Sequence, residues 1–309
     1  MLSNRIALIL VTALAPMIWG TTYYVTTELL PPDRPLFASL VRALPAGLLL
    51  VAVTRRLPSG DWWWRALVLG TLNIGAFLPL LFLAAYRLPG GVAATVGAIQ
   101  PLIVVGLSAV VLNDRLTLRK ALAGVGGVFG VALLVLRANA QLDMLGVFAA
   151  LAGAFVMGTG VVLSKRWVSP APVLATTGWQ LVAGGVLLLP VTLIVEGVPS
   201  EITGQNVLGL AYLSIVGAAI TYALWFRGIR SLTAVNVTFL SLLSPVVATV
   251  VGWLALDQKL SAAQLIGALI VLVSLIAAQT QGVNNADDRV RSRGNRRAPS
   301  RSRSLVSKP

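Results

Sequence analysis

The chain has 309 residues, of which 57% are hydrophobic and 11% charged, with a formal net charge of +14. It contains no cysteine and no histidine, so disulfides, thiolate chemistry, haem and ordinary zinc sites lack support, and we expect no metal and no cofactor. The apolar residues form runs of about twenty rather than amphipathic stripes, which is typical of a polytopic helical membrane protein.

Ten apolar runs are predicted as transmembrane helices, and the connections between them are too short for a separate soluble domain. In chain order they are residues 6–25, 37–53, 66–83, 92–112, 118–136, 146–163, 174–195, 207–226, 234–256 and 262–278. The first run partly resembles a signal peptide, but Pro16 follows its small residues directly and disfavours cleavage, so we expect a retained span.

One stretch of the chain occurs twice. Residues 89–120 match residues 233–264 at a constant offset of 144. Each copy has an apolar run with a proline in its middle, Pro101 or Pro245, then a short charged turn and a second apolar run. A proline inside a helix frees a carbonyl and bends the helix. Pro101 and Pro245, together with Pro16 in the first span, are therefore predicted as kinks that allow gating.

A second match lies at an offset of 138, where Arg42-Ala-Leu-Pro-Ala-Gly47 faces Gln180-Leu-Val-Ala-Gly-Gly185. The halves would be residues 1–138, with spans one to five, and residues 139–280, with spans six to ten. Because five is an odd number, the second half would enter the membrane inverted. Secondary carriers are often built from such repeats around a midplane site. Chance similarity between leucine-rich segments is the alternative.

The loops differ in their content of lysine and arginine. With the N-terminus inside, the basic residues that fall outside are Arg34, Arg87, Arg137 and Lys259, whereas the remaining basic loop residues and the tail are inside. The positive-inside rule then predicts a multi-pass protein of the plasma (inner) membrane with both termini in the cytoplasm.

These features resemble the drug/metabolite transporter superfamily, and within it the EamA-type ten-helix permeases. The resemblance rests on Trp19-Gly20-Thr21-Thr22 in span one, Arg42 followed by Ala46-Gly47 in span two, and the proline-centred spans four and nine. It implies two inverted EamA-type repeats that enclose a central cavity, lined mainly by spans one to four and six to nine. It also implies export of amino acids and other metabolites, with spans five and ten outside as support or as a dimer contact.

Arg42 is the outstanding intramembrane residue, because a charge at that depth costs several kcal/mol unless it is paired or hydrated. It could face a wet cavity and offer a forked donor to a substrate carboxylate or phosphate. Alternatively, it could form a structural ion pair, with Glu28 for example, or extend outward to the interface. Its counterpart Gln180 can form hydrogen bonds but carries no charge.

Five further residues are candidates for substrate binding. The polar ones could hydrogen-bond a solute or, equally, hold helices together, and Trp19 could stack on a substrate or pack in the core. These candidates are Trp19, Asn73, Gln100, Tyr222 and Asn236.

Coupling and oligomeric state stay open at this stage. No aspartate or glutamate falls in the middle of a span, so an obvious proton relay is missing. Gly126 and Gly130 in span five form a small-residue face that could pack inside one chain or form a homodimer contact.

Residues 281–309 change abruptly to a basic, serine-rich composition, which predicts a disordered cytoplasmic tail. We expect this tail to contact anionic lipid. Nucleic-acid binding is not expected, since no aromatic residues are interleaved with the basic ones.

The leading interpretation is a secondary transporter that exports amino acids or related small metabolites and drugs by alternating access, with Arg42 and Gln180 binding the solute near the centre. A transporter of a lipid-linked or phosphorylated substrate is the alternative, followed by a non-transporting scaffold. An enzyme is not expected, because the acid/base or metal set that catalysis requires is missing.

Overall fold

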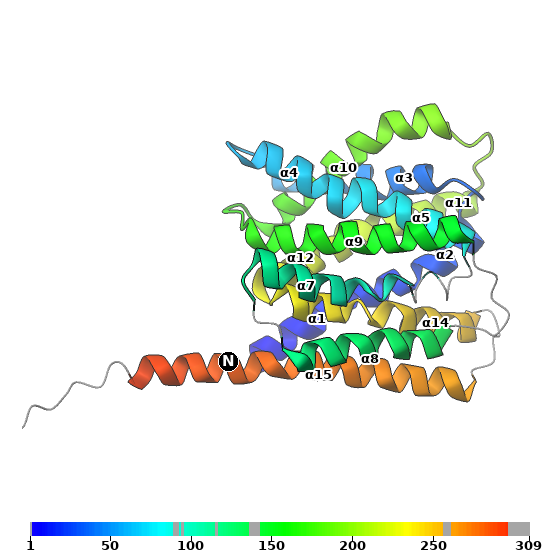
Figure 1. The fold of residues 1–309 in the computed structure, drawn as a ribbon. Helices are drawn as coiled ribbons and strands as arrows, with labels where there is room; N and C mark the ends of the chain where they lie inside the picture. Colours follow the sequence, from blue (N-terminus) through cyan, green and yellow to red (C-terminus); the bar gives the residue numbers. More distant parts are fainter. Residues whose placement is uncertain are drawn as a thin grey trace, which may run out of the picture.

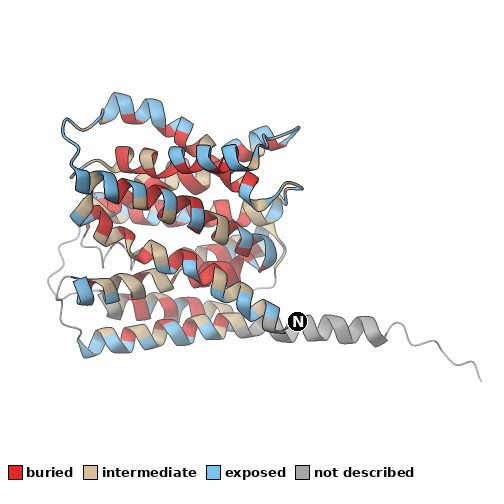
Figure 2. Cartoon of the chain, turned by 180° about the vertical axis from the view of Figure 1, so that it is seen from behind, coloured by how far each residue is buried: buried red, intermediate tan, exposed pale blue. Residues whose placement is uncertain are grey.

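The computed structural model describes residues 2–88, 93, 96–114, 117–135, 143–255 and 261–295 of the chain. Throughout these residues the regular secondary structure is helical, with no strand. The helices lie side by side in a bundle (Figure 1). Exposed residues cover its outer faces and buried residues gather between the helices (Figure 2).

Eight helical stretches are long and apolar enough to cross a membrane, judged by length and composition, within the described ranges. They are Asn4–Leu29, Pro35–Thr54, Trp62–Arg87, Met144–Arg166, Val173–Val195, Gly204–Ser231, Ala234–Ala255 and Ala262–Gln279. The shorter apolar helix α7 (Gln100–Val111) and helix α8 (Leu118–Val135) lie where spans four and five were predicted. The prediction of an all-α polytopic membrane protein is confirmed.

Several spans consist of more than one helix. Span one contains α1 (Leu2–Gly20) and α2 (Thr22–Leu29). Spans three and eight each contain a π-helix between two α-helices, with the bounds α4 (Trp62–Gly70), η1 (Thr71–Ala76), α5 (Phe77–Arg87), α11 (Gly204–Ser214), η2 (Ile215–Ile220) and α12 (Thr221–Ser231). Both π-helices have six residues, and they begin 144 residues apart, the offset of the sequence repeat. Such π-turns are rare and frequently lie at functional sites.

Spans four and nine are interrupted near their prolines, whereas Pro16 lies inside the continuous helix α1. In span nine, α13 (Ala234–Leu240) ends before a turn, and α14 (Leu243–Ala255) contains Pro245 as its third residue. Helix α7 likewise begins directly before Pro101, after a turn at Ala98 and Ile99. A proline in the first helical turn forfeits no hydrogen bond, because that N–H has no partner within the helix.

Helix α3 (Pro35–Thr54) packs closely against α10 (Val173–Val195) through paired glycines. A Cβ added at Gly47 would lie 2.6 Å from the backbone nitrogen of Val182, and one added at Gly185 would lie 2.8 Å from Leu44 Cβ. The two glycines are the ones that the offset of 138 aligned. Each helix therefore lets the other approach closely at the equivalent glycine of its own sequence.

Helices α8 and α15 (Ala262–Asn295) pack together on the far side of the bundle from α3 and α10 (Figure 1). A Cβ at Gly130 would lie 3.0 Å from the carbonyl oxygen of Gly267, and one at Gly126 would lie 2.9 Å from Ser274 Oγ. The small-residue face of span five is therefore used for packing inside the chain, the first of its two predicted alternatives.

The C-terminal tail differs in part from its predicted disorder. Helix α15 continues to Asn295, so residues 281–295 are helical. Extending an existing helix avoids the cost of nucleation, and this allows a polar sequence to continue it. The rest of the predicted tail, residues 296–309, lies outside the described residues.

The two ends of the bundle differ in charge. At the basic end, defined by Arg55, Arg56, Lys165, Arg166 and Arg230, the ammonium of Lys165 donates to the carbonyls of Ile229 (3.0 Å) and Arg230 (3.1 Å). The helix α9 (Met144–Arg166) is thereby tied to the C-terminus of α12.

At the opposite end, a carboxylate caps a neighbouring helix. The two oxygens of Glu196 each accept a backbone N–H at the start of α3, from Leu36 and Phe37, both at 2.8 Å. Helix N-termini favour such an anion. The end of α10 is therefore fixed to the beginning of α3.

We predict that Gly47→Ala lowers the melting temperature in detergent, because its Cβ would overlap the α10 backbone; overpacking of this kind costs about 1–3 kcal/mol. The control is Gly106→Ala in α7, where an added Cβ meets nothing within 4 Å. A melting temperature of Gly47→Ala equal to that of the control would contradict the close α3–α10 contact.

Candidate functional site

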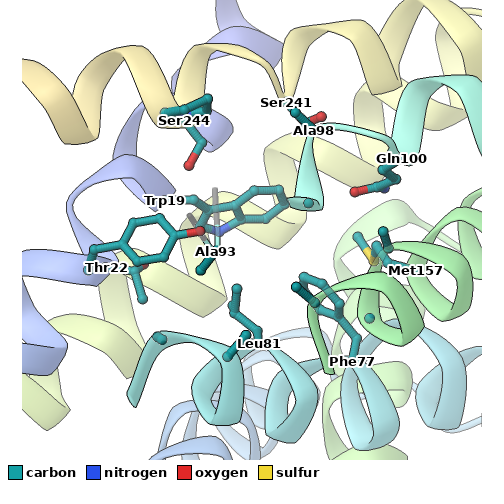
Figure 3. A pocket seen from close by; sticks show the side chains of 18 of the residues that line it. Trp19, Thr22, Phe77, Leu81, Ala93, Ala98, Gln100, Met157, Ser241 and Ser244 are labelled. Carbon is teal, nitrogen blue, oxygen red and sulfur yellow. The ribbon is translucent and has the colours of Figure 1, made fainter. Parts of the chain in front are cut away.

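A cavity lies between the helices in the middle of the bundle. It extends towards the end of the bundle that is opposite the basic end. The volume of this cavity is about 120 Å³. Its lining includes Arg42 of α3, Trp225 of α12, Ala84 near the end of α5 and Ala149 near the beginning of α9. Figure 3 shows Trp19, Gln100, Ser241 and Ser244 around this cavity.

Arg42 is 1% exposed and lines the cavity. Its Nη2 donates to the carbonyl of Gly217 at 2.9 Å, whereas Nε and Nη1 have no hydrogen-bond partner among the described residues. The guanidinium carbon lies 5.9 Å from the centre of the Phe82 ring. Within the same residues no carboxylate forms an ion pair with Arg42, and the suggested pair with Glu28 is not formed. Two nitrogens of a buried cation are thus unpaired in the described part of the chain.

The carbonyl oxygen of Gly217, in the π-helix η2, accepts hydrogen bonds from three side chains. The donors are Arg42 Nη2, Trp19 Nε1 at 3.1 Å and Thr221 Oγ1 at 2.7 Å. Trp19 Nε1 also lies 2.9 Å from Thr221 Oγ1. The guanidinium therefore shares this carbonyl oxygen with two neutral donors, and the contact involves no carboxylate. The hydrogen bond to Gly217 also fixes the orientation of the guanidinium and hence the directions of the unpaired nitrogens Nε and Nη1.

Aromatic rings form a wall beside the guanidinium. The centre of the Trp19 ring lies 5.2 Å from that of Tyr222 and 5.1 Å from that of Trp225, both tilted contacts. Such pairs stabilise each other by about 0.5–1.5 kcal/mol beyond the area they bury. The structure therefore brings Trp19 and Tyr222, two predicted site residues, to the same cavity as Arg42.

The interruptions in spans four and nine contribute the facing wall. Gly97 and Ala98 line the cavity, and so do Ser241 and Leu242, 144 residues later. Non-helical backbone at membrane depth is tolerated where it lines a cavity, and broken helices mark the sites of many carriers. The amide of Gln100, another predicted residue, points into the cavity (Figure 3).

Gln180 and Asn73 lie away from this cavity, so the structure does not bring them to Arg42. Asn73 Nδ2 donates to Gln180 Oε1 at 2.8 Å and to Ser164 Oγ at 3.2 Å. Gln180 lines a smaller cavity at the basic end, together with Ser164 and Lys165. In this conformation the two amides join helices rather than face the main cavity.

The remaining predicted residues are Asn236 and the three prolines. Asn236 is 3% exposed, and its backbone carbonyl accepts Gln279 Nε2 at 2.8 Å. Pro16 is buried inside α1 and Pro101 is buried at the beginning of α7, while Pro245 lines the cavity.

The polar contacts of the two halves correspond to each other. Arg42 of span two binds Gly217 in the π-helix of span eight, and Gln180 of span seven binds Asn73 in the π-helix of span three. Gln180 is 138 residues after Arg42, and Gly217 is 144 residues after Asn73. Each half therefore uses the same helix to reach the π-helix of the other.

Sequence reasoning missed several cavity residues. Tyr23, Phe77 and Phe82 lie in apolar runs where nothing distinguishes them from packing residues. Gly217 was detectable, because it occupies the position of Asn73 in the second repeat.

A family model matches almost the whole chain. The model of the EamA-like transporter family matches residues 6–136 and again residues 144–278. The chain belongs to the EamA-like transporter family. The resemblance inferred from the sequence is confirmed, and the EamA-like chain is a multi-pass membrane protein.

Named relatives agree with this assignment. Protein PecM of Dickeya dadantii is 45% identical over 267 residues, covering 86% of the EamA-like chain and 90% of that protein. A chloroplastic WAT1-related protein of Arabidopsis thaliana is 30% identical, covering 83% and 66% respectively. A Salmonella typhimurium protein named "Probable amino-acid metabolite efflux pump" is 30% identical, covering 66% and 72%. One crystal structure shares the fold, with a TM-score of 0.74 at 21% identity over 88% of the chain and 98% of its own.

We predict that Gly160→Ala lowers the melting temperature, because its Cβ would lie 2.0 Å from Asn73 Oδ1 and displace the amide from Gln180. The control on the same helix is Gly153→Ala, whose Cβ would be in ordinary contact with Leu80 at 3.4 Å. In an Asn73→Ala background, Gly160→Ala should lower the free energy of unfolding by at least about 1 kcal/mol less than it does in the wild type. This difference measures the coupling between the two residues. Additive effects of the two substitutions would disprove the contact.

Proposed function

We propose that this chain is a secondary transporter that exports small organic solutes, such as amino acids, related metabolites and drugs, by alternating access. The observation that carries the proposal is Arg42, a buried cation that lines a cavity within the membrane-spanning bundle and whose Nε and Nη1 have no hydrogen-bond partner among the described residues. An intramembrane charge that lines a cavity marks a substrate path in membrane proteins. The relative named as an amino-acid metabolite efflux pump supports both the direction and the solute class.

Alternating access would use the two halves, residues 1–138 and 139–280, as inverted repeats. In the described conformation the main cavity extends towards the opposite end. At the basic end the halves are joined by the Asn73–Gln180 hydrogen bond and by Trp179 Nε1, which donates to the carbonyl of Arg56 at 2.7 Å. Solute entry from the basic end would require these contacts to open. The interruptions near Pro101 and Pro245 are where the halves would bend.

We further propose that the basic end faces the cytoplasm of a cell whose inner membrane holds the protein. The lysines and arginines gathered there support this orientation. Both termini would then be cytoplasmic, and the basic tail would contact anionic lipid. A homodimer remains a proposal, and its contact would lie outside the α8 glycines that pack inside the chain.

We predict that Arg42→Ala abolishes solute counterflow in proteoliposomes preloaded in turn with pools of amino acids, other carboxylates, sugars and cationic drugs. Removal of the guanidinium leaves the cavity without its charged donor. The control is Arg87→Gln, at an exposed ion pair with Asp143, which should retain counterflow because such pairs contribute little. Normal counterflow by folded Arg42→Ala would exclude the central binding role.

The proposed orientation is tested by thiol labelling, because the chain has no cysteine of its own. Ser59→Cys lies in an exposed loop at the basic end, and Ser200→Cys in an exposed loop at the opposite end. A membrane-impermeant maleimide added to intact cells should label Ser200→Cys and leave Ser59→Cys unlabelled until the cells are opened. The reverse pattern would invert the proposed topology.

A further inference from the structure

We propose that the preferred solutes are organic monoanions with an aromatic or apolar body, and that zwitterionic amino acids bind more weakly. This inference rests on the proposed transport function and narrows its substrate class.

The first argument is the charge balance of the cavity. Arg42 is the cationic residue of its described lining, which contains no carboxylate. The sequence extends this statement to the whole chain, because none of its ten acidic residues falls in the middle of a span: Glu28, Asp33, Asp61, Asp114, Asp143, Glu196, Glu201, Asp257, Asp287 and Asp288. A buried charge is costly without a counter-ion. The missing negative charge is therefore supplied by the solute.

The second argument concerns the hydrogen bonds still available to Arg42. Its Nη2 is used by Gly217, and Nε and Nη1 have no partner in the part of the chain that the structure describes. Nε and Nη1 lie on opposite edges of the planar guanidinium, so a carboxylate would accept from one of them together with the N–H that Nη2 leaves free. A neutral amide offers one acceptor oxygen and no charge, so it satisfies this site less completely.

The third argument concerns the α-ammonium group of an amino acid. In an amino acid the ammonium is attached to the carbon next to the carboxylate. A carboxylate held by Arg42 would therefore bring the ammonium within a few ångströms of the guanidinium. Like charges at that distance repel each other strongly in a cavity of low polarity. The carbonyl of Gly217, which could have accepted the ammonium, already has three donors.

The fourth argument is the shape and chemistry of the wall. The centre of the Phe82 ring lies 5.9 Å from the guanidinium carbon, and Trp19, Phe77, Tyr222 and Trp225 line the same cavity. Met157 adds a polarisable side chain. Rings bind well to such walls through stacked and edge contacts. The cavity therefore matches an apolar ring that carries its charge at one end.

Three solutes with the same phenyl body test the inference: 3-phenylpropionate, its neutral amide 3-phenylpropanamide, and the zwitterion phenylalanine. Binding to the purified protein is followed by tryptophan fluorescence, since Trp19 and Trp225 line the cavity, and transport is followed by counterflow. We expect 3-phenylpropionate to bind at least tenfold more tightly than either of the others. A tenfold preference corresponds to about 1.4 kcal/mol.

Two variants test whether the charge of Arg42 causes the preference for 3-phenylpropionate. Arg42→Gln should bind the acid and the amide equally, with amide binding unchanged from wild type as evidence of an intact cavity. Gln100→Glu places a carboxylate on the same cavity; it should weaken 3-phenylpropionate at least fivefold and strengthen phenylalanine. This second variant keeps Arg42 and introduces a counter-charge, so it tests the charge argument even if Arg42→Gln does not fold.

The outcomes separate this inference from the transport proposal. Phenylalanine or the amide binding as tightly as 3-phenylpropionate overturns the inference, even if counterflow occurs. Absence of binding by all three in folded protein overturns it as well. Tight, Arg42-dependent binding of 3-phenylpropionate supports the inference, and if counterflow of every solute is then absent, the transport proposal is the one that fails.

Discussion

The hydrogen bond from Arg42 to the carbonyl of Gly217 is the contact on which the centre of this protein depends. A guanidinium at membrane depth costs several kcal/mol unless it is stabilised, and here the stabilising group is a backbone oxygen rather than a carboxylate. Trp19 and Thr221 bind the same oxygen, so α1, α3 and η2 meet at one atom. Because the carbonyl is neutral, it leaves the positive charge of Arg42 without a counter-charge.

The close packing of the helices makes this contact possible. Glycines at the α3–α10 and α8–α15 contacts let backbones approach within distances that a Cβ would prevent. Helix association in membranes depends on such packing, since lipid tails compete equally for apolar surface. With α3 held firmly against α10, Arg42 reaches η2 and Gln180 reaches η1 in corresponding ways. The cavity forms between the helices that these hydrogen bonds hold in place.

A large share of the fold could be predicted from sequence, because lipid imposes a simple rule: an apolar run of about twenty residues spans the membrane as a helix. Arg42 was identified for the same reason, since a charge in such a run is expensive. The behaviour of Pro101 and Pro245 was predicted only in part. Their positions mark a break in the helix, but the choice between a bend and an interruption depends on the turns at Ala98–Ile99 and Ser241–Leu242, which neighbouring helices surround.

The sequence by itself determined the helical membrane class, the family resemblance, the internal repeat and the presence of a cation that needs a partner, because each follows from composition or spacing along the chain. The tertiary structure decided which groups share one cavity. It placed Trp19, Gln100 and Tyr222 beside Arg42, and it placed Gln180 and Asn73 at another site. It also made Gly217, a residue with no side chain, the partner of Arg42. Such assignments depend on how helices distant in sequence rotate and approach each other, and no local pattern records those rotations.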